Sequence, residues 1–197
     1  SGSRIALAAQ QYGSVSGTRR QLSGVQELQN LGIPGYQLDG VITEQLLGEF
    51  SKTTHLVVTA APRREAPFHD PLLSLLQQIP DNLLPCMEWI AYLSTIGVYG
   101  NHDGRWVDEQ TPCTSAQQRS LMRIEAEKQW LQFGASRNLL VSVLRLSGIY
   151  GPGRNAVEDA ISGRARMLIK PNQVFNRIHV DDLAAAAIKA ATIRHDG

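Results

Sequence analysis

Segments that resemble buried β-strands alternate with helical segments along most of this 197-residue chain. The clearest strand is predicted over 55–61, a continuous run His-Leu-Val-Val-Thr-Ala-Ala, which is typical of a strand buried on both faces of a parallel sheet. Further strands are predicted over 87–95 and 139–146, with shorter ones over 14–18 and 36–39. Strands separated by helices imply right-handed βαβ crossovers. The pattern therefore predicts an α/β fold with a doubly wound, Rossmann-like parallel sheet and helices on both faces.

Helical periodicity fills the intervals between these strands. Helices are predicted over 4–12, 23–31, 42–50, 70–78, 112–134 and 181–192. In the longest of them, Ser115 and Gln118 have the spacing of a capping box, and Leu121, Ile124 and Leu131 share one side. No repeat or linker interrupts the pattern, so one domain is expected over 1–197.

The composition is that of an ordinary globular protein, with 43% hydrophobic and 19% charged residues. A formal net charge of +1 gives no basic field that would indicate a nucleic-acid partner. The longest apolar stretches are too short to span a membrane, and the start lacks a signal-peptide pattern. Cys86 and Cys113 have no metal-ligand spacing, so no metal site is expected and both are predicted to be packing residues in a reduced compartment.

Three segments carry more specific information than the fold pattern. They are Leu93-Ser-Thr-Ile-Gly-Val-Tyr-Gly100, Arg145-Leu-Ser-Gly-Ile-Tyr-Gly-Pro-Gly-Arg154 and Arg177-Ile-His-Val-Asp-Asp-Leu183. In this order and spacing, the chain resembles the NAD-dependent epimerase/dehydratase family of extended short-chain dehydrogenases/reductases. The resemblance runs from about Ser3 to Thr192.

The resemblance implies a Rossmann domain with part of a smaller substrate-binding insertion over about 151–180. Ligands would lie outside the carboxyl ends of the strands. Cofactor contacts would come from strand ends, namely Thr59, Ala60, Ala61, Pro62, Ser94, Ser147 and Gly148. The family reduces, epimerises or dehydrates sugar-nucleotide-like or small carbonyl substrates. The resemblance is also compatible with a homodimer. It implies a soluble, intracellular protein, in the cytoplasm or an organelle matrix such as a plastid, with no membrane or nucleic-acid partner.

The resemblance assigns Thr95 to the catalytic site, where its hydroxyl would hydrogen-bond the substrate oxygen. Alternatively, Thr95 ends a strand and closes a turn. The family's Tyr-x-x-x-Lys pair is replaced here by Arg119 and Arg123. Arg123 would orient the nicotinamide ribose, whereas an arginine in the tyrosine position cannot be a general acid near neutral pH because its pKa is above about 12. The alternative for both arginines is a solvated helix face.

Cofactor choice is predicted from the end of the second family strand, Gly17-Thr-Arg-Arg20. NAD-binding domains usually place an acid there for the ribose 2′-OH, and none is present. The hydroxyl of Thr18 and the guanidinium groups of Arg19 and Arg20 instead favour a 2′-phosphate, so NADP(H) is expected rather than NAD. Asp39 matches the family's adenine contact, or caps the following helix.

The resemblance assigns Tyr150, Arg154, Arg177 and His179 to a substrate cleft. Arg154 and Arg177 would hold a phosphate or carboxylate, while His179 is alternatively a core histidine. The acids that follow at 181–182 are expected to cap the last helix and to interact with its dipole.

No Gly-x-Gly-x-x-Gly loop occurs in the chain, and the strand that would precede it has no counterpart. We therefore expect a fold truncated at the N-terminus and in the C-terminal substrate region. The strand would lie between those at 14–18 and 55–61, and its absence would leave unpaired backbone groups costing about 1–3 kcal/mol each. Two functions remain open: an NADP(H)-dependent oxidoreductase or isomerase, and a non-catalytic nucleotide-sensing or scaffold module.

Overall fold

A three-stranded parallel sheet forms the centre of the structure, a computed structural model that describes residues 1–63, 70–165 and 174–193. Its order is β3 (His55–Val58), β4 (Trp89–Thr95) and β5 (Leu140–Leu146). Trp89 lies opposite Leu140 and Thr95 opposite Leu146, so the carboxyl ends of β4 and β5 are level. The predicted Rossmann-like α/β fold is confirmed.

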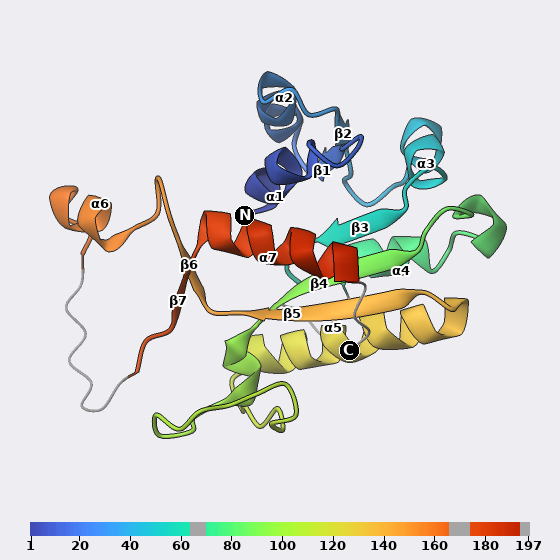
Figure 1. Cartoon of the computed structure of the whole chain (residues 1–197). Helices are drawn as coiled ribbons and strands as arrows, with labels where there is room; N and C mark the ends of the chain where they lie inside the picture. Colours follow the sequence, from blue (N-terminus) through green and yellow to red (C-terminus); the bar gives the residue numbers. More distant parts are fainter. Residues whose placement is uncertain (64–69, 166–173, 194–197) are drawn as a thin grey trace.

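Helices cover both faces of this sheet. The described helices are α1 (Gly2–Ala9), α2 (Leu22–Asn30), α3 (Glu44–Phe50), α4 (Pro71–Leu76), α5 (Gln118–Arg137), α6 (Ala156–Ile161) and α7 (Val180–Ile193), with 3₁₀ turns η1 (Asp81–Leu83) and η2 (Ile96–Tyr99). Those that pack on the sheet are α1, α3, α4, α5 and α7, whereas α2 packs on β1 and β2. Figure 1 shows α5 and α7 on opposite sides of β4 and β5. No helix in the described ranges is long and apolar enough to cross a bilayer.

Two hydrophobic clusters hold the layers together. The larger joins the sheet to α3, α4 and α5, with Tyr92 of β4 near-parallel to Trp130 of α5 at 6.2 Å between ring centroids. The smaller joins the opposite face to α1 and α7 through Ile5, Leu93 and Leu183. Because alternate residues of β4 serve the two clusters, β4 is buried along nearly its whole length.

Two further strand pairs lie apart from this sheet. Strand β1 (Gly17–Arg19) pairs in parallel with β2 (Gly35–Gln37), and β6 (Gly148–Tyr150) pairs in parallel with β7 (Arg177–His179). Among the described strands, none joins β1 to β3. The two therefore flank a cleft rather than a continuous sheet.

The prediction that the strand at 55–61 is buried on both faces is wrong for most of its length. Strand β3 ends at Val58, and only Val58 is buried, whereas His55, Leu56 and Val57 are half-buried. The physical reason is that one edge of β3 borders the cleft, so it lacks the neighbour that shields a central strand.

The predicted capping box of the longest helix is wrong, and the side that carries Leu121 and Leu131 is not the one that packs on the sheet. Helix α5 begins at Gln118 without a side-chain cap, because Ser115 Oγ accepts from the Gln117 N–H. Leu121 and Leu131 are exposed. The face that packs on the sheet is formed by Met122, Ala126, Trp130 and Phe133, whose spacing of three or four residues aligns them in one stripe.

The cysteines are not both packing residues. Cys86 is exposed, and Cys113 is half-buried. Cys86 follows η1 in the turn before β4, where backbone hydrogen bonds rather than side-chain burial fix the chain.

Candidate functional site

The amino end of α1 meets the carboxyl ends of β1 and β3. Arg19 at the end of β1 donates from Nη2 to Ser3 Oγ at 2.8 Å. Gly2 lies against Thr59, just after β3, so closely that a Cβ at Gly2 would be 3.2 Å from Thr59 Oγ1. The sequence places small residues at this helix start, and their size permits the close approach.

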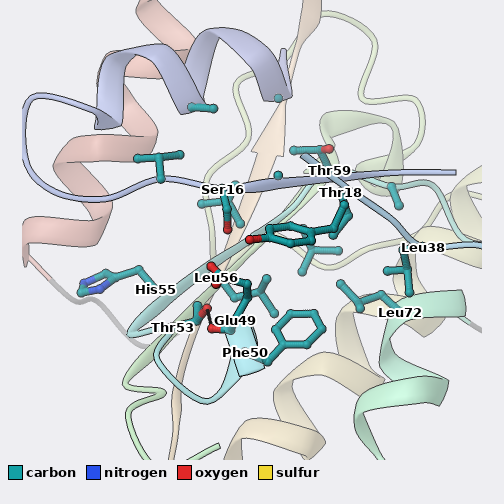
Figure 2. Close-up of a pocket in the computed structure, with 18 of the residues that line it drawn as sticks. Ser16, Thr18, Leu38, Glu49, Phe50, Thr53, His55, Leu56, Thr59 and Leu72 are labelled. Carbon is teal, nitrogen blue, oxygen red and sulfur yellow. Dashed lines mark hydrogen bonds between the residues drawn. The ribbon is translucent and has the colours of Figure 1, made fainter. Parts of the chain in front are cut away.

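A cleft of about 2140 Å³ runs from this junction between β1 and β3. Figure 2 shows side chains of both edges around it, with Ser16 and Thr18 from the β1 side and His55, Leu56 and Thr59 from the β3 side. Pockets that hold a drug-sized ligand are about 300–1,000 Å³. The cleft is therefore larger than a small ligand alone requires.

Positive charge gathers at the amino end of α1. The pKa of the Ser1 amino group is lowered, first by burial and then by the charges of Arg154, Arg19 and Arg4. The first N–H groups of a helix lack intrahelical acceptors, and the helix dipole adds partial positive charge there. This junction therefore suits an anion such as a phosphate.

Arg19 and Arg20 differ in what they contact. Arg19 is half-buried and donates from Nη1 to its neighbour's carbonyl, Thr18 O, at 3.1 Å. Arg20 is exposed and forms an ion pair with Asp39 at 3.0 Å. Asp39 does not cap α3, because Thr43 accepts from the Leu46 N–H in that position. The segment thus presents the guanidinium of Arg19, which is held by hydrogen bonds, and the exposed guanidinium of Arg20, which is paired with a carboxylate.

Ser94 and Thr95 end β4 with different partners. Thr95 Oγ1 accepts from the Gly97 N–H at 3.1 Å and caps η2, as the turn-closing alternative predicts. That contact leaves the Thr95 O–H as a donor. Ser94 is buried and donates to Glu127 of α5.

Glu127 belongs to a buried polar network that the sequence reasoning missed. Its carboxylate is 2.9 Å from Arg145 Nη2 of β5, and Arg145 Nη1 is 3.1 Å from the hydroxyl of Tyr99. The Glu127 and Tyr99 contacts raise the pKa of Arg145 despite the opposing effect of burial. Arg145, a charged residue inside the largely apolar segment 139–146, was the signal that could have indicated this network, because a charged group in a buried strand needs a partner.

Arg119 and Arg123 occupy different environments on α5. Arg119 is exposed in the first turn. Arg123 donates from Nη1 to the Tyr92 hydroxyl at 3.0 Å and to the Leu93 carbonyl at 2.9 Å. Burial raises the pKa of Tyr92 to about 12, with the Arg123 charge opposing the shift. Tyr92 is therefore neutral near pH 7, and Arg123 ties α5 to β4.

The residues assigned to substrate lie around β6 and β7. Tyr150 and His179 are opposite each other in the ladder, with ring centroids 5.1 Å apart. His179 Nδ1 accepts from the Asp181 N–H at 3.3 Å, so His179 itself caps α7 and the acids at 181–182 lie inside its first turn. Arg177 stacks its guanidinium over Phe175.

The structure brings together part of the predicted site. The cleft is lined by residues assigned to the cofactor, which are Thr18, Arg19, Arg20, Asp39, Thr59, Ala60 and Ala61. Of the other residues assigned to the cofactor, Pro62 is buried, Ser147 is half-buried and Gly148 is exposed at the start of β6. The residues assigned to catalysis and to substrate binding are not among the described residues that line the cleft. No cluster of potential metal ligands occurs in the described ranges.

Comparisons with known proteins place this geometry among related folds. No family model matches the chain. It is 30% identical over 146 residues to Protein YeeZ of Escherichia coli K12, an alignment that covers 72% of this chain and 52% of YeeZ. The chain thus spans about half the length of this curated relative.

Solved structures extend the match over nearly the whole chain. A functionally unknown conserved protein from Silicibacter pomeroyi DSS is 36% identical with a TM-score of 0.83, covering 100% of this chain and 65% of that one. UDP-glucuronic acid 4-epimerase from Bacillus cereus, solved in complex with UDP-glucuronic acid and NAD, is 14% identical with a TM-score of 0.76, covering 99% of this chain and 71% of the epimerase. The chain therefore has the fold of NAD-dependent epimerases and dehydratases. The truncation expected from the sequence stays a prediction.

Proposed function

We propose that this chain is the dinucleotide-binding part of an NADP(H)-dependent oxidoreductase or isomerase. The observation that carries the proposal is the contact of Arg19 with Ser3 at the amino end of α1, where the carboxyl ends of β1 and β3 meet. Helix N–H groups and arginines are the groups that hold phosphates in such folds. The Bacillus cereus epimerase with this fold carries NAD, which supports a nicotinamide dinucleotide as the ligand.

The residues present fit a phosphorylated ribose. Arg19 is fixed by two hydrogen bonds at the junction, and Arg20 is exposed beside it. A 2′-phosphate would accept charge-assisted hydrogen bonds from both guanidinium groups, and Asp39 would hold Arg20 in reach. The preference for NADP(H) over NAD rests on these arginines and on the absence of an acid within residues 17–20.

Calorimetric titration with NADPH, with NADH as the control ligand, tests this proposal. We expect saturable binding that favours NADPH, and Arg19→Ala is expected to weaken NADPH binding at least about tenfold, or about 1.4 kcal/mol. Arg164→Ala is the matched control, because Arg164 is an exposed arginine paired with Asp159 beyond α6. Absence of binding by both dinucleotides would contradict the proposal.

For the reaction, we propose a carbonyl or sugar-nucleotide-like substrate whose oxygen is held by the Thr95 hydroxyl. Thr95 ends β4 at the carboxyl edge of the sheet and keeps its O–H available. Turnover would be abolished by Thr95→Val and retained by Thr95→Ser, which keeps the hydroxyl and the cap of η2. Loss of turnover in the Thr95→Ser variant, which keeps both the hydroxyl and the cap, would contradict this assignment of Thr95.

One observation favours the second candidate, a non-catalytic nucleotide-sensing module. Arg123 is committed to Tyr92 and Leu93, and Arg119 cannot donate a proton near neutral pH. A chain that binds NADPH but turns over no substrate in a panel of carbonyl compounds would support this candidate.

A further inference from the structure

Ser120 is a buried serine in the first turn of α5, and its side chain is 5% exposed. Among the residues that the structure describes, none hydrogen-bonds the Ser120 hydroxyl. A helical serine commonly donates to a nearby backbone carbonyl, as Ser136 of the same helix does to Phe133 O at 2.9 Å. Because an unpaired polar group in the interior is costly, the Ser120 hydroxyl points to a partner from outside the chain.

The Ser120 hydroxyl faces η2, the turn that follows β4 and lies beside the start of α5 (Figure 1). A Cβ at Gly97 of this turn would be 3.3 Å from Ser120 Oγ and 3.4 Å from Thr95 Oγ1, and these are its two nearest atoms. Gly97 itself is exposed. The two hydroxyls therefore border one small position that is open to solvent.

Both hydroxyls can donate at this position. Thr95 Oγ1 accepts from the Gly97 N–H at 3.1 Å, which fixes the oxygen and leaves its O–H free. An oxygen atom in the position of the Gly97 Cβ would be 3.3 and 3.4 Å from the two hydroxyl oxygens, slightly beyond an ordinary O–H···O distance. A small movement of the ligand or of the Ser120 side chain removes that excess.

The chemistry of two hydroxyls suits an uncharged oxygen that changes between two states. A carbonyl oxygen can accept from both Thr95 and Ser120. An alcohol can accept from one and donate to the other, because each hydroxyl is both a donor and an acceptor. The same pair can therefore hold a carbonyl group and the alcohol formed by its reduction.

Ser120 takes this place instead of the residue that the resemblance assigns to it. Arg119 is aligned with the family's tyrosine, but it is exposed. Successive residues of a helix are turned by about 100° from each other, so Arg119 and Ser120 lie on different sides of α5. The hydroxyl that reaches the Thr95 turn from α5 thus belongs to Ser120.

We propose that Ser120 is a substrate-binding residue whose hydroxyl, together with that of Thr95, holds one carbonyl or alcohol oxygen over Gly97. This inference rests on the reaction proposed for Thr95 and not on the choice of nucleotide. Gly97 determines specificity for such an oxygen, because a side chain there would occupy the position between the two hydroxyls.

Cyclohexanone is the probe, because it offers one carbonyl oxygen and no charge. It is titrated into the full chain without nucleotide, while NMR follows the amide of Gly97, which donates to Thr95 Oγ1. A saturable shift is expected at Gly97, and none at Gly32, an exposed glycine after α2. Cyclohexanol is expected to bind within about threefold of cyclohexanone, because both hydroxyls can donate and accept.

Two variants test the contact directly. Ser120→Ala is expected to weaken cyclohexanone binding at least about threefold, because one hydrogen bond is lost. Gly97→Ala is expected to abolish binding and to keep the fold, because Gly97 is not among the described glycines with positive φ.

Ser136→Ala is the matched control on the same helix, and it is expected to leave cyclohexanone binding unchanged. Chemical denaturation is expected to show no loss of stability in Ser120→Ala, because that hydroxyl has no partner among the described residues. A measurable loss in Ser136→Ala is expected, because its hydroxyl has one.

Three results would overturn the proposal. The first is the absence of a saturable shift at Gly97. The second is equal binding of cyclohexanone by Ser120→Ala and the original chain. The third is a larger loss of stability in Ser120→Ala than in Ser136→Ala, which would give the Ser120 hydroxyl a structural role.

The nucleotide proposal is separated from this one by the calorimetric titration. A chain that binds NADPH but not cyclohexanone refutes the Ser120 contact alone. A chain that binds neither dinucleotide but binds cyclohexanone through Ser120 refutes the nucleotide proposal and supports the contact.

Discussion

The two sheets that flank the cleft have the same parallel strand pairing but differ in how far their strands are buried. In the β3–β4–β5 sheet, β4 has a strand on each side and is buried from Trp89 to Ser94. In the β1–β2 sheet, every residue of β1 is only half-buried. Strand β3, with one neighbour, is intermediate.

The difference shows that burial of a strand here depends on its neighbours more than on its own residues. His55-Leu-Val-Val58 is as apolar as many central strands, yet three of its four residues remain partly accessible. The closed sheet also holds the buried Ser94–Glu127–Arg145 network, whereas the charges near the open sheet, Arg20 and Asp39, are largely exposed. The closed sheet is therefore expected to dominate the stability of the chain.

The largest effect is expected from breaking the network in the closed sheet. Glu127→Ala leaves the Arg145 guanidinium without its carboxylate and the Ser94 hydroxyl without its acceptor. Removing one partner of a buried ion pair costs about 3–5 kcal/mol. Chemical denaturation should show this loss in the free energy of unfolding.

Glu125→Ala is the matched control for that change. Glu125 is on the same helix, two positions before Glu127, but is half-buried and accepts from Gln129 at 3.0 Å. We expect a loss of no more than about 1 kcal/mol. Equal losses in the two variants would show that helix propensity, and not the buried network, sets the effect.

A smaller but opposite effect is expected from closing the open sheet. Extending the chain before Ser1 by an apolar strand and a glycine-rich loop would pair both cleft edges. Burial of about five apolar side chains, less the entropy of ordering them, gives a gain of about 3 kcal/mol. Thermal unfolding should move to higher temperature, and a midpoint equal to or below that of the original chain would refute the expectation.

The fold was predictable because its signals are local. Strand-like segments such as Leu140–Leu146 and helix signals such as the pair Asp70-Pro71 need no knowledge of distant residues. Asp70 caps α4 as its position before proline suggests, and its Oδ1 accepts from the Leu72 and Leu73 N–H groups.

The site was less predictable because its contacts join distant segments. The Arg19 contact with Ser3, the Arg20 contact with Asp39 and the link of Arg145 to Glu127 depend on tertiary packing that periodicity does not encode. Which side of α5 is covered has a similar origin, since both Leu121 and Trp130 are apolar and packing on the sheet decides which of them is buried.

A third prediction tests whether the two sheets unfold together. Leu28 of α2 is buried against Gly17 of β1, with its Cδ1 3.0 Å from where a Cβ of that glycine would lie. Leu28→Ala should cost about 2–3 kcal/mol locally. Hydrogen exchange should accelerate at the amides of β1 and β2 and remain nearly unchanged in β4 and β5. Equal acceleration in both sheets would make them one cooperative unit.

The smallest effect concerns the acid buried in the closed sheet's larger cluster. Burial raises the pKa of Asp70 above its ordinary value of 3.8, while hydrogen bonds from Leu73 and Leu72 oppose the shift. Between 3.8 and the raised pKa the folded chain binds more protons than the unfolded chain, so the stability of wild type should fall as pH rises through that window and then level off. Asp70→Asn keeps a good N-cap and removes the ionisable group, so this fall should disappear and stability near pH 7 should be equal or higher, by up to about 1 kcal/mol.

Asp39→Asn is the counterpart beside the open sheet, where an exposed ion pair is worth about 0.5 kcal/mol or less. Denaturation midpoints measured across the acidic range would check both, and a wild-type midpoint that rises with pH where the Asp70→Asn variant is flat would show that the hydrogen bonds to Asp70 outweigh its burial.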